Sequence, residues 1–189
     1  MNICIYGSSS NEIDRVYMEK TEALGSTMAH RGHTLVFGGG ARGLMGAAAR
    51  GMSSGSGNII GVAPSFFNIN DILYKGCTEL ILTETMRQRK QIMEEKSDAF
   101  IVTPGGIGTF EEFFEILTLK QLGRHSKPIA VYNINGYYNS IMDVMKRAAD
   151  DKFMSKSSIN LCKFFDDHEN LLDYLESYKP ENFISEKLK

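Results

Sequence analysis

The chain has 189 residues, of which 42% are hydrophobic and 23% are charged, and this suits a single globular domain. Its formal net charge of −2 argues against a general nucleic-acid-binding protein, which would carry a basic excess. The three cysteines, Cys4, Cys77 and Cys162, are too few and too widely spaced for a disulfide framework or a zinc site.

Taken in chain order, short apolar runs alternate with segments of helical pattern. The first strand-like run begins directly at residue 2, and the N-terminal segment lacks the basic start and long apolar stretch of a signal peptide. No run is long enough for a membrane span, so we expect a cytoplasmic protein with no membrane partner. Strands are predicted at 2–6, 34–37, 58–63, 78–82, 99–103, 128–132 and 161–165. Helices are predicted at 12–31, 44–49, 86–96, 109–122, 137–149 and 169–178.

The predicted strands are continuous apolar runs, which is typical of strands buried on both faces. Their alternation with helices predicts an α/β fold, a Rossmann-like parallel sheet with helices on both faces. We expect residues 1–179 to form one nucleotide-binding domain and residues 180–189 a polar tail. Ligands of such folds bind beyond the carboxyl ends of the strands, and three of these ends are rich in Gly or Ser, at 7–10, 38–46 and 104–109.

The segment Gly38-x-Gly40-x-x-Gly43 matches the dinucleotide-binding fingerprint in form. It follows the second predicted strand instead of the first, and no acidic residue stands about 20 positions on, where one should take the ribose hydroxyls. A nicotinamide-dependent oxidoreductase is therefore disfavoured. The alternative is that these glycines allow tight turns and close packing of helix on sheet.

A second glycine loop, Pro104-Gly105-Gly106-Ile107-Gly108-Thr109, joins a predicted buried strand to a helix start. Its glycines leave backbone N–H groups open to a ligand, and a helix N-terminus adds partial positive charge. The loop therefore predicts a phosphate-binding site. The alternative is a tight turn in which Thr109 caps the helix.

The helix after this loop has an apolar stripe, formed by Phe110, Phe113, Phe114 and Leu117. Glu111 and Glu112 are expected in its first turn, where the helix dipole alone favours acidic residues. Glu111, Glu115 and Thr118 share a face, and Glu112 is expected on that polar side. A carboxylate there suits sugar hydroxyls or a cationic centre of a ligand better than the phosphate.

Another predicted helix begins with basic residues. Helical spacing places two cations and two apolar residues on one face: Met86, Arg89, Lys90 and Met93. A guanidinium on an inward face needs an anionic partner. Cations at a helix start also oppose the dipole, which favours a specific role in anion recognition. The alternative is a solvated face that pairs with Glu94 and Glu95.

Two motifs give the chain its resemblance to the LOG (Lonely Guy) family. Segment 104–112 is similar to the family's PGGxGTxxE motif, and Met86-Arg87-Gln88-Arg89-Lys90 is similar to MxxRK. Segments 38–46, 97–100 and 135–138 also fall in family-like order, so that the resemblance covers about residues 2–150. The older family label, lysine decarboxylase, implies pyridoxal phosphate on a Schiff-base lysine, and no glycine loop here offers such a lysine.

The resemblance implies a cytokinin riboside 5'-monophosphate phosphoribohydrolase. Such an enzyme hydrolyses the N-glycosidic bond of an N6-modified adenosine 5'-monophosphate to free base and ribose 5-phosphate. By motif position, Arg89 and Glu112 are the implied catalytic pair. The implied substrate-binding residues are Lys90, Gly105, Gly106, Ile107, Gly108, Thr109, Phe110, Glu111, Thr118, Asp71, Gly39, Gly40 and Ser8. The resemblance also implies a homodimer.

The implied chemistry suits these residues. Glycoside cleavage passes through an oxocarbenium-like state. The Glu112 carboxylate can stabilise this cation or activate the attacking water. An arginine side chain keeps its proton at neutral pH, so we expect Arg89 to orient Glu112, hold phosphate or stabilise charge on the departing base. No step requires a metal or an organic cofactor. A nucleotide-binding sensor module without turnover is the alternative, and a pure binder needs no such pair.

Two positions near the motifs depart from the family pattern. Arg87 stands where many members have His, and Leu119 stands where many have Trp. A substrate-contacting Glu of the family corresponds to Asp71 here. These positions shape the base end of the expected pocket, so the preferred N6 substituent stays open and plain AMP is a candidate substrate.

Overall fold

The computed structural model describes residues 1–67 and 72–180. Its strands are β1 (Asn2–Tyr6), β2 (Thr34–Phe37), β3 (Asn58–Pro64), β4 (Glu79–Thr83), β5 (Ala99–Val102), β6 (Ile129–Tyr132) and β7 (Lys163–Phe165). Its α-helices are α1 (Arg15–His30), α2 (Gly43–Ser54), α3 (Met86–Glu95), α4 (Ile107–Gln121), α5 (Asn139–Asp150) and α6 (His168–Ser177). Three short 3₁₀ turns are η1 (Ser65–Phe67), η2 (Ile134–Gly136) and η3 (Lys156–Leu161). Of the predicted polar tail, all but residue 180 lies outside the described residues.

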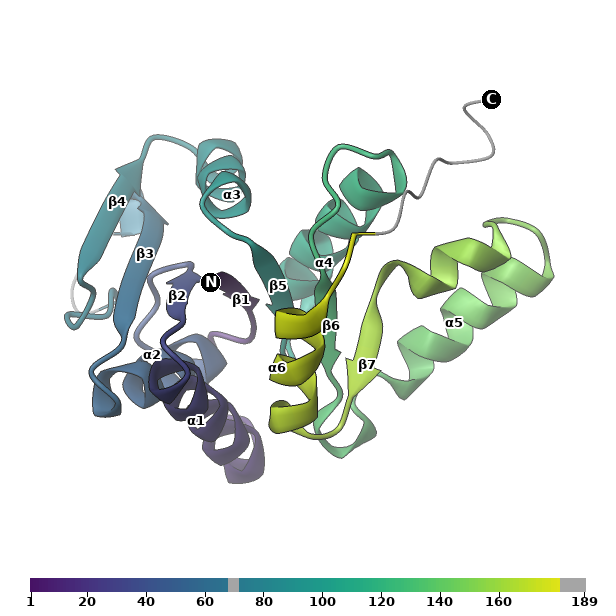
Figure 1. Cartoon of the computed structure of the whole chain (residues 1–189). Coiled ribbons are helices and arrows are strands. Elements are labelled where there is room, and N and C mark those ends of the chain that lie inside the picture. Colours follow the sequence, from purple (N-terminus) through teal and green to yellow (C-terminus); the bar gives the residue numbers. More distant parts are fainter. Residues whose placement is uncertain (68–71, 181–189) are drawn as a thin grey trace.

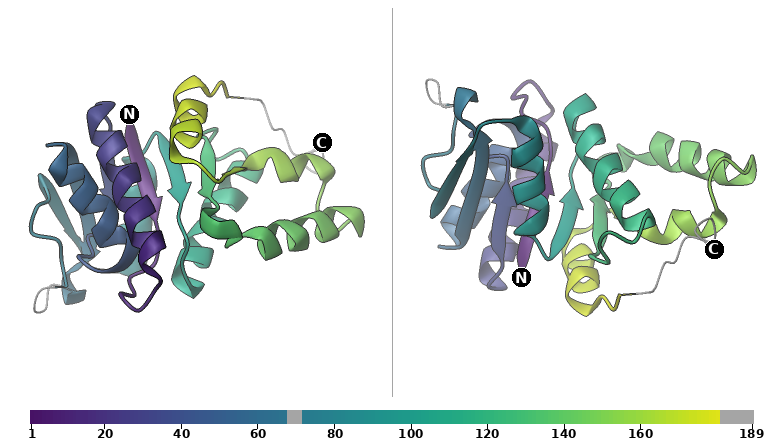
Figure 2. Two further views of the ribbon diagram at one scale, coloured as in Figure 1. Left: turned by 90° about the horizontal axis from the view of Figure 1, so that it is seen from below. Right: turned by 90° about the horizontal axis from the view of Figure 1, so that it is seen from above.

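All seven predicted strands are present, and they form one parallel sheet in the order β4-β3-β2-β1-β5-β6-β7. Helices α1, α2 and α6 cover one face of the sheet, and α3, α4 and α5 cover the other, as Figures 1 and 2 show. The predicted Rossmann-like α/β fold is therefore confirmed.

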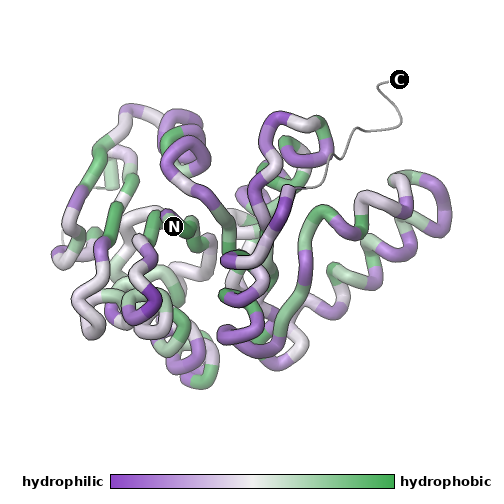
Figure 3. The backbone as a smooth tube through the Cα atoms, in the orientation of Figure 1, coloured by the Kyte–Doolittle hydropathy of each residue, from purple (hydrophilic) through white to green (hydrophobic). Residues whose placement is uncertain are grey.

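The central strands explain why their sequences are apolar throughout. Successive side chains of a strand point to opposite faces of the sheet. In β1, Ile3 and Ile5 enter the core under α1, α2 and α6, whereas Cys4 and Tyr6 enter the core under α3, α4 and α5. Both faces are covered by helices, so no position can be polar without cost. The outer helices instead alternate between hydrophilic and hydrophobic positions, as α5 does in Figure 3.

The order of the strands creates a switch point between β1 and β5. The chain moves outward from β1 to β4 and then continues with β5 on the other side of β1. The two loops that leave β1 and β5 lie side by side, since Thr103 N–H donates to Tyr6 O at 2.8 Å and Ser8 N–H donates to Pro104 O at 3.0 Å. Ligands of open α/β sheets bind in the crevice at this place.

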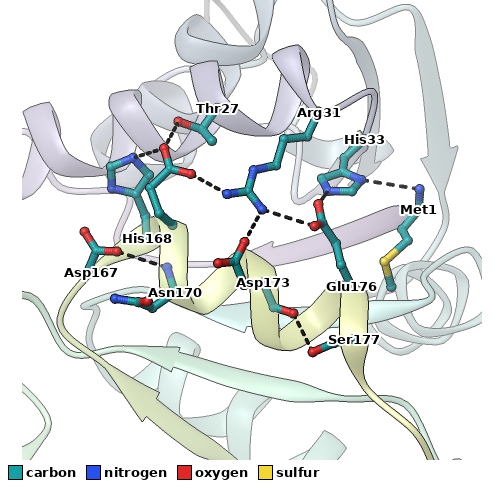
Figure 4. Close-up of polar contacts among 11 residues, drawn as sticks. Met1, Thr27, Arg31, His33, Asp167, His168, Asn170, Asp173, Glu176 and Ser177 are labelled. Carbon is teal, nitrogen blue, oxygen red and sulfur yellow. Dashed lines mark hydrogen bonds and ion pairs between the residues drawn. The ribbon is translucent and has the colours of Figure 1, made fainter.

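Helix α6 is joined to α1 by an ion-pair network on the face opposite α3 and α4 (Figure 4). Arg31 pairs with Glu169, with Asp173 at 2.7 Å and with Glu176 at 3.1 Å. His33 Nε2 lies 2.8 Å from a Glu176 oxygen. Exposed ion pairs contribute little individually, so we attribute most of the docking of α6 to its buried leucines, Leu171, Leu172 and Leu175. Within residues 1–67 and 72–180, no helix is long and apolar enough to cross a membrane.

Candidate active site

The loop after β5 leads into α4 earlier than the sequence predicts. The helix begins at Ile107, and Gly106 is its N-cap residue without any side-chain cap. The alternative interpretation of this loop, a tight turn in which Thr109 caps the helix, is therefore wrong. Glu111 and Glu112 are also not in the first turn, which contains no acidic residue. Their position is thus not explained by the favourable interaction of acids with a helix start.

The loop and helix start present a row of open donors. Among the described residues, no backbone N–H group of residues 105–109 donates to a protein acceptor. Residues 106–108 are exposed. A Cβ atom at Gly106 or Gly108 would meet no described atom within 4 Å, and neither glycine has a positive φ. The turn itself does not need these two glycines, whereas an approaching anion would.

Gly106→Val is expected to weaken AMP binding about tenfold or more while costing the fold at most about 1 kcal/mol, the usual effect of a poorer N-cap residue. The space around Gly106 is open, so the fold has room for the valine side chain, and we expect this side chain to occupy the place of the ligand. Titration calorimetry and thermal melts measure the two effects.

Gly105→Val is the matched control for this prediction, because a Cβ atom there would lie 2.1 Å from Thr109 Oγ1 and must disturb the turn. We expect this control to lower the melting temperature. If Gly106→Val destabilises the fold as much as it weakens binding, the glycine serves only the turn.

Arg89 is held in a buried position over the ends of β2 and β3. Helix α3 begins with a capping box formed by Thr85 and Gln88, so the helix start is fixed without the basic residues. The Arg89 side chain is 9% exposed, and its Nε donates to Val62 O at 3.2 Å. Its Nη1 lies 3.2 Å from Glu112 Oε1. The solvated alternative, in which Arg89 pairs with neighbouring glutamates of α3, is therefore wrong.

Gly38 provides the space for this guanidinium. A Cβ atom at Gly38 would lie 2.0 Å from Arg89 Nη2 and 3.0 Å from Arg89 Cζ. The φ of Gly38 is not positive, so space is the reason that glycine stands here. Sequence reasoning missed this contact, because nothing local connects a strand end at 38 with a helix residue at 89.

Gly38→Ala should displace the Arg89 guanidinium and lower kcat by about tenfold or more, since a misplacement near 1 Å can cost up to about 10² in rate. Steady-state kinetics on the single and double variants test this. Alanine at 38 should cost nothing further in the Arg89→Ala background, because the group it displaces is gone. Additive losses would mean that Gly38 acts on something other than Arg89.

Glu112 faces Arg89 from α4 and is only 8% exposed. Its predicted place on the polar side of α4 with Glu111 and Glu115 is wrong, because it turns inward beside Phe113 and Ile116. Burial raises the pKa of Glu112 to about 7, and the positive charge of Arg89 limits the rise. A carboxyl group with a pKa near neutrality suits general acid–base chemistry.

Lys90 joins the same two helices nearer the surface. Its ammonium pairs with Glu111 and lies 2.8 Å from Glu115 Oε2. Burial alone would lower the pKa of Lys90, but the two carboxylates raise it overall. Lys90 and Glu111, both predicted substrate-binding residues, therefore contact one another, and Glu111 is about half exposed.

A small pocket of about 90 Å³ opens between α3 and α4 close to these residues. Tyr6 of β1 lines it together with Lys90, Glu115 and Ile116. Arg87 and Leu119 line the same pocket, so the two departures from the family pattern lie together. That both residues shape the base end of a ligand site stays a prediction.

Helix α2 begins at the end of the glycine segment after β2, and its first N–H groups donate to the protein itself. Gly43 N–H donates to Asn11 Oδ1 at 2.8 Å, and Leu44 N–H donates to Ser8 O at 2.8 Å. A Cβ atom at Gly43 would lie 2.3 Å from Ser8 O. In the part of the chain that the structure describes, the first four N–H groups of α2 all have protein acceptors, so they are not open to a pyrophosphate, as the disfavoured dinucleotide interpretation would require.

The remaining predicted site residues take no part in the contact between Arg89 and Glu112. Gly39 O accepts a hydrogen bond from Tyr74 N–H, and Gly40 forms an isolated β-bridge with Leu73. Both glycines therefore have a structural role in holding the segment 72–74. Ser8 bonds Pro104 at the loop after β5, while Thr118 is exposed farther along α4. Thr109 is buried, Phe110 is half-buried against Tyr138, and Ile107 is 86% exposed. Asp71 lies outside the described residues.

The chain is similar in sequence and in fold to known proteins. A family model described as "Possible lysine decarboxylase" matches residues 45–175. The cytokinin riboside 5'-monophosphate phosphoribohydrolase LOG2 of Arabidopsis thaliana is 35% identical over 185 residues, which is 97% of this chain and 87% of the relative. A probable enzyme of the same name, LOGL6 of Oryza sativa subsp. japonica, is 36% identical over 180 residues, or 95% and 72% of the two chains.

Among solved structures, the molybdenum cofactor carrier protein of Chlamydomonas reinhardtii superposes with a TM-score of 0.72 at 20% identity. The alignment covers 93% of this chain and 95% of that chain. At this level of identity the likeness shows a shared fold and carries no statement about ligand.

Proposed function

The chain belongs to the LOG family, whose older description is lysine decarboxylase, and we propose that it is a nucleotide N-glycosidase. It hydrolyses the N-glycosidic bond of adenosine 5'-monophosphate, plain or N6-modified, to free base and ribose 5-phosphate. The observation that carries this proposal is the buried pair of Arg89 and Glu112, 3.2 Å apart, with Glu112 on the helix whose start carries the open N–H groups of 105–109.

Each part of the site has a place in the reaction. The N–H groups of 105–109 bind the 5'-phosphate at the positive end of α4. Glu112, as the carboxylate, stabilises the developing oxocarbenium ion or takes a proton from the attacking water. The C1'–N bond breaks, the water oxygen bonds to C1', and the departing base accepts a proton. Arg89 holds the Glu112 carboxylate in place.

A sensor module without turnover is the alternative, and the burial of Glu112 argues against it. A buried carboxylate with a raised pKa costs the fold stability when it is ionised, and a nucleotide binder gains nothing from that cost. Incubation with AMP and with isopentenyladenosine monophosphate, followed by chromatography for free base, separates the two functions. Binding without release of either base would favour the sensor. The relative rates give the preferred N6 substituent.

We also propose a homodimer formed through α4. Of the three phenylalanines in the predicted apolar stripe, Phe113 is buried and Phe110 is half-buried, so Phe114 is the one that remains at the surface. It shares one side of α4 with exposed Ile107 and, just past the helix, Leu122. Grouped apolar side chains of this kind commonly mark interfaces, and closed two-fold pairing is the commonest assembly.

Light scattering is expected to give twice the chain mass of 21.1 kDa, and Phe114→Glu is expected to shift the protein toward the monomer. A wild-type mass near 21.1 kDa at working concentration would refute the dimer.

Two further expectations from the sequence stay proposals. Residues 1–179 form a single nucleotide-binding domain, and the protein is cytoplasmic.

A further inference from the structure

Two adjacent tyrosines reach from the turn after β6 to the loop that carries the open N–H groups. Tyr138 is fully buried, and its hydroxyl donates to Thr103 O at 2.8 Å, next to the end of β5. Tyr137 is 42% exposed, yet its hydroxyl donates to Gly105 O at 2.6 Å. Tyr138 therefore supports the strand end from the core, whereas Tyr137 acts on the glycine loop itself.

The turn that carries Tyr137 is held firmly. Asn133 Oδ1 accepts a bond from Tyr138 N–H at 2.7 Å, and Asn133 Nδ2 donates to Asn139 Oδ1 at 2.9 Å. The Tyr137 ring meets the Tyr138 ring edge-on with centroids 5.0 Å apart, and it meets the Tyr17 ring at 6.2 Å. These contacts on two sides fix the ring that presents the hydroxyl to Gly105.

The hydroxyl of Tyr137 determines the direction of a donor that it does not touch. A trans peptide unit is rigid, so Gly105 C=O and Gly106 N–H point in opposite directions. A glycine on each side lets this unit rotate at low cost, and rotation would turn a carbonyl oxygen toward a bound anion. With Gly105 O held by Tyr137, Gly106 N–H stays on the opposite side, where it meets no acceptor among the described residues.

We propose that Tyr137 is a positioning residue for the phosphate-binding loop, holding the Gly105 carbonyl so that Gly106 N–H faces the 5'-phosphate. The proposal rests on the proposed function, because it takes the loop at 104–109 as the phosphate site. Tyr137 acts through the loop and need not touch the substrate.

Tyr137→Phe tests this, because the change removes one oxygen atom and keeps the ring contacts. The melting temperature should stay close to that of the wild type. The Kd for ribose 5-phosphate and the KM for AMP should both rise roughly five- to tenfold, the size of one lost hydrogen bond. The kcat/KM for adenosine should not change, because adenosine has no phosphate. In ¹⁵N spectra, the shift of the Gly106 amide on adding ribose 5-phosphate should be reduced.

Tyr17→Phe is the matched control, since it removes a hydroxyl from the same aromatic group and leaves the loop's bond intact; it should leave both constants unchanged. If wild-type protein binds ribose 5-phosphate and Tyr137→Phe binds it equally well, the positioning role is wrong. Equal losses for AMP and adenosine would also overturn it in favour of a general structural role. If the wild type fails to bind ribose 5-phosphate, the proposed function fails first and this inference fails with it.

Discussion

Replacing Glu112 by Gln is expected to lower turnover by about 10² or more, the scale of a lost acid–base group, while the fold and most nucleotide affinity remain. Gln has nearly the same volume, and its amide oxygen can still accept a bond from Arg89, so the buried guanidinium keeps a partner. Single-turnover release of base and calorimetric binding of AMP measure the two effects separately.

Glu95→Gln is a suitable control, because this carboxylate lies on the exposed side of α3 and should not affect turnover.

The pH dependence of the rate is a second test of the role of Glu112. Because the pKa of Glu112 is raised to about 7, the working carboxylate is lost as pH falls through that value, and kcat/KM should decline below it. The decline should be absent from the residual activity of Glu112→Gln. Wild-type turnover in that variant would remove Glu112 from the mechanism.

Removing the 5'-phosphate from the substrate is expected to lower kcat/KM by at least about 10²-fold, which corresponds to about 2.7 kcal/mol. The open donors of 105–109 favour an anion, and we expect binding energy at the phosphate to position the reacting bond against Glu112. Comparing adenosine with AMP, and isopentenyladenosine with its monophosphate, measures the effect.

Rapid cleavage of the nucleosides would give a different account of the site. The loop at 104–109 would then not be a phosphate site, and the enzyme would resemble an ordinary nucleoside hydrolase. The role in anion recognition that we expect from the sequence for Arg89 and Lys90 would fall as well. In the structure the Lys90 ammonium already lies between Glu111 and Glu115, so we expect backbone donors to provide most of the contacts to the phosphate.

The strands could be predicted well because each is an apolar run closed by a glycine, a proline or a polar turn. The start of α4 could not, because Gly108 and the exposed Ile107 both lie in its first turn and interrupt the apolar stripe. That error of two residues moved Glu111 and Glu112 into the first turn, where the helix dipole offered a plain explanation for them.

The burial of Glu112 is a tertiary property that the local pattern does not contain. Flanked by Glu111 and followed by Glu115, it has the spacing of a solvated face. It turns inward because α3 supplies Arg89, and Arg89 fits there because Gly38 leaves room. The motif resemblance identified both members of the pair, but their contact required the packing of two helices and two strand ends.

Quantifying both products of AMP after incubation with the protein tests the central claim most directly. We expect free adenine and ribose 5-phosphate to appear in equal amounts as AMP disappears, with oxygen from ¹⁸O-labelled water in the ribose 5-phosphate. Recovery of intact AMP, together with tight binding, would contradict the assignment of an enzyme. Adenosine and inorganic phosphate as products would contradict cleavage at the N-glycosidic bond.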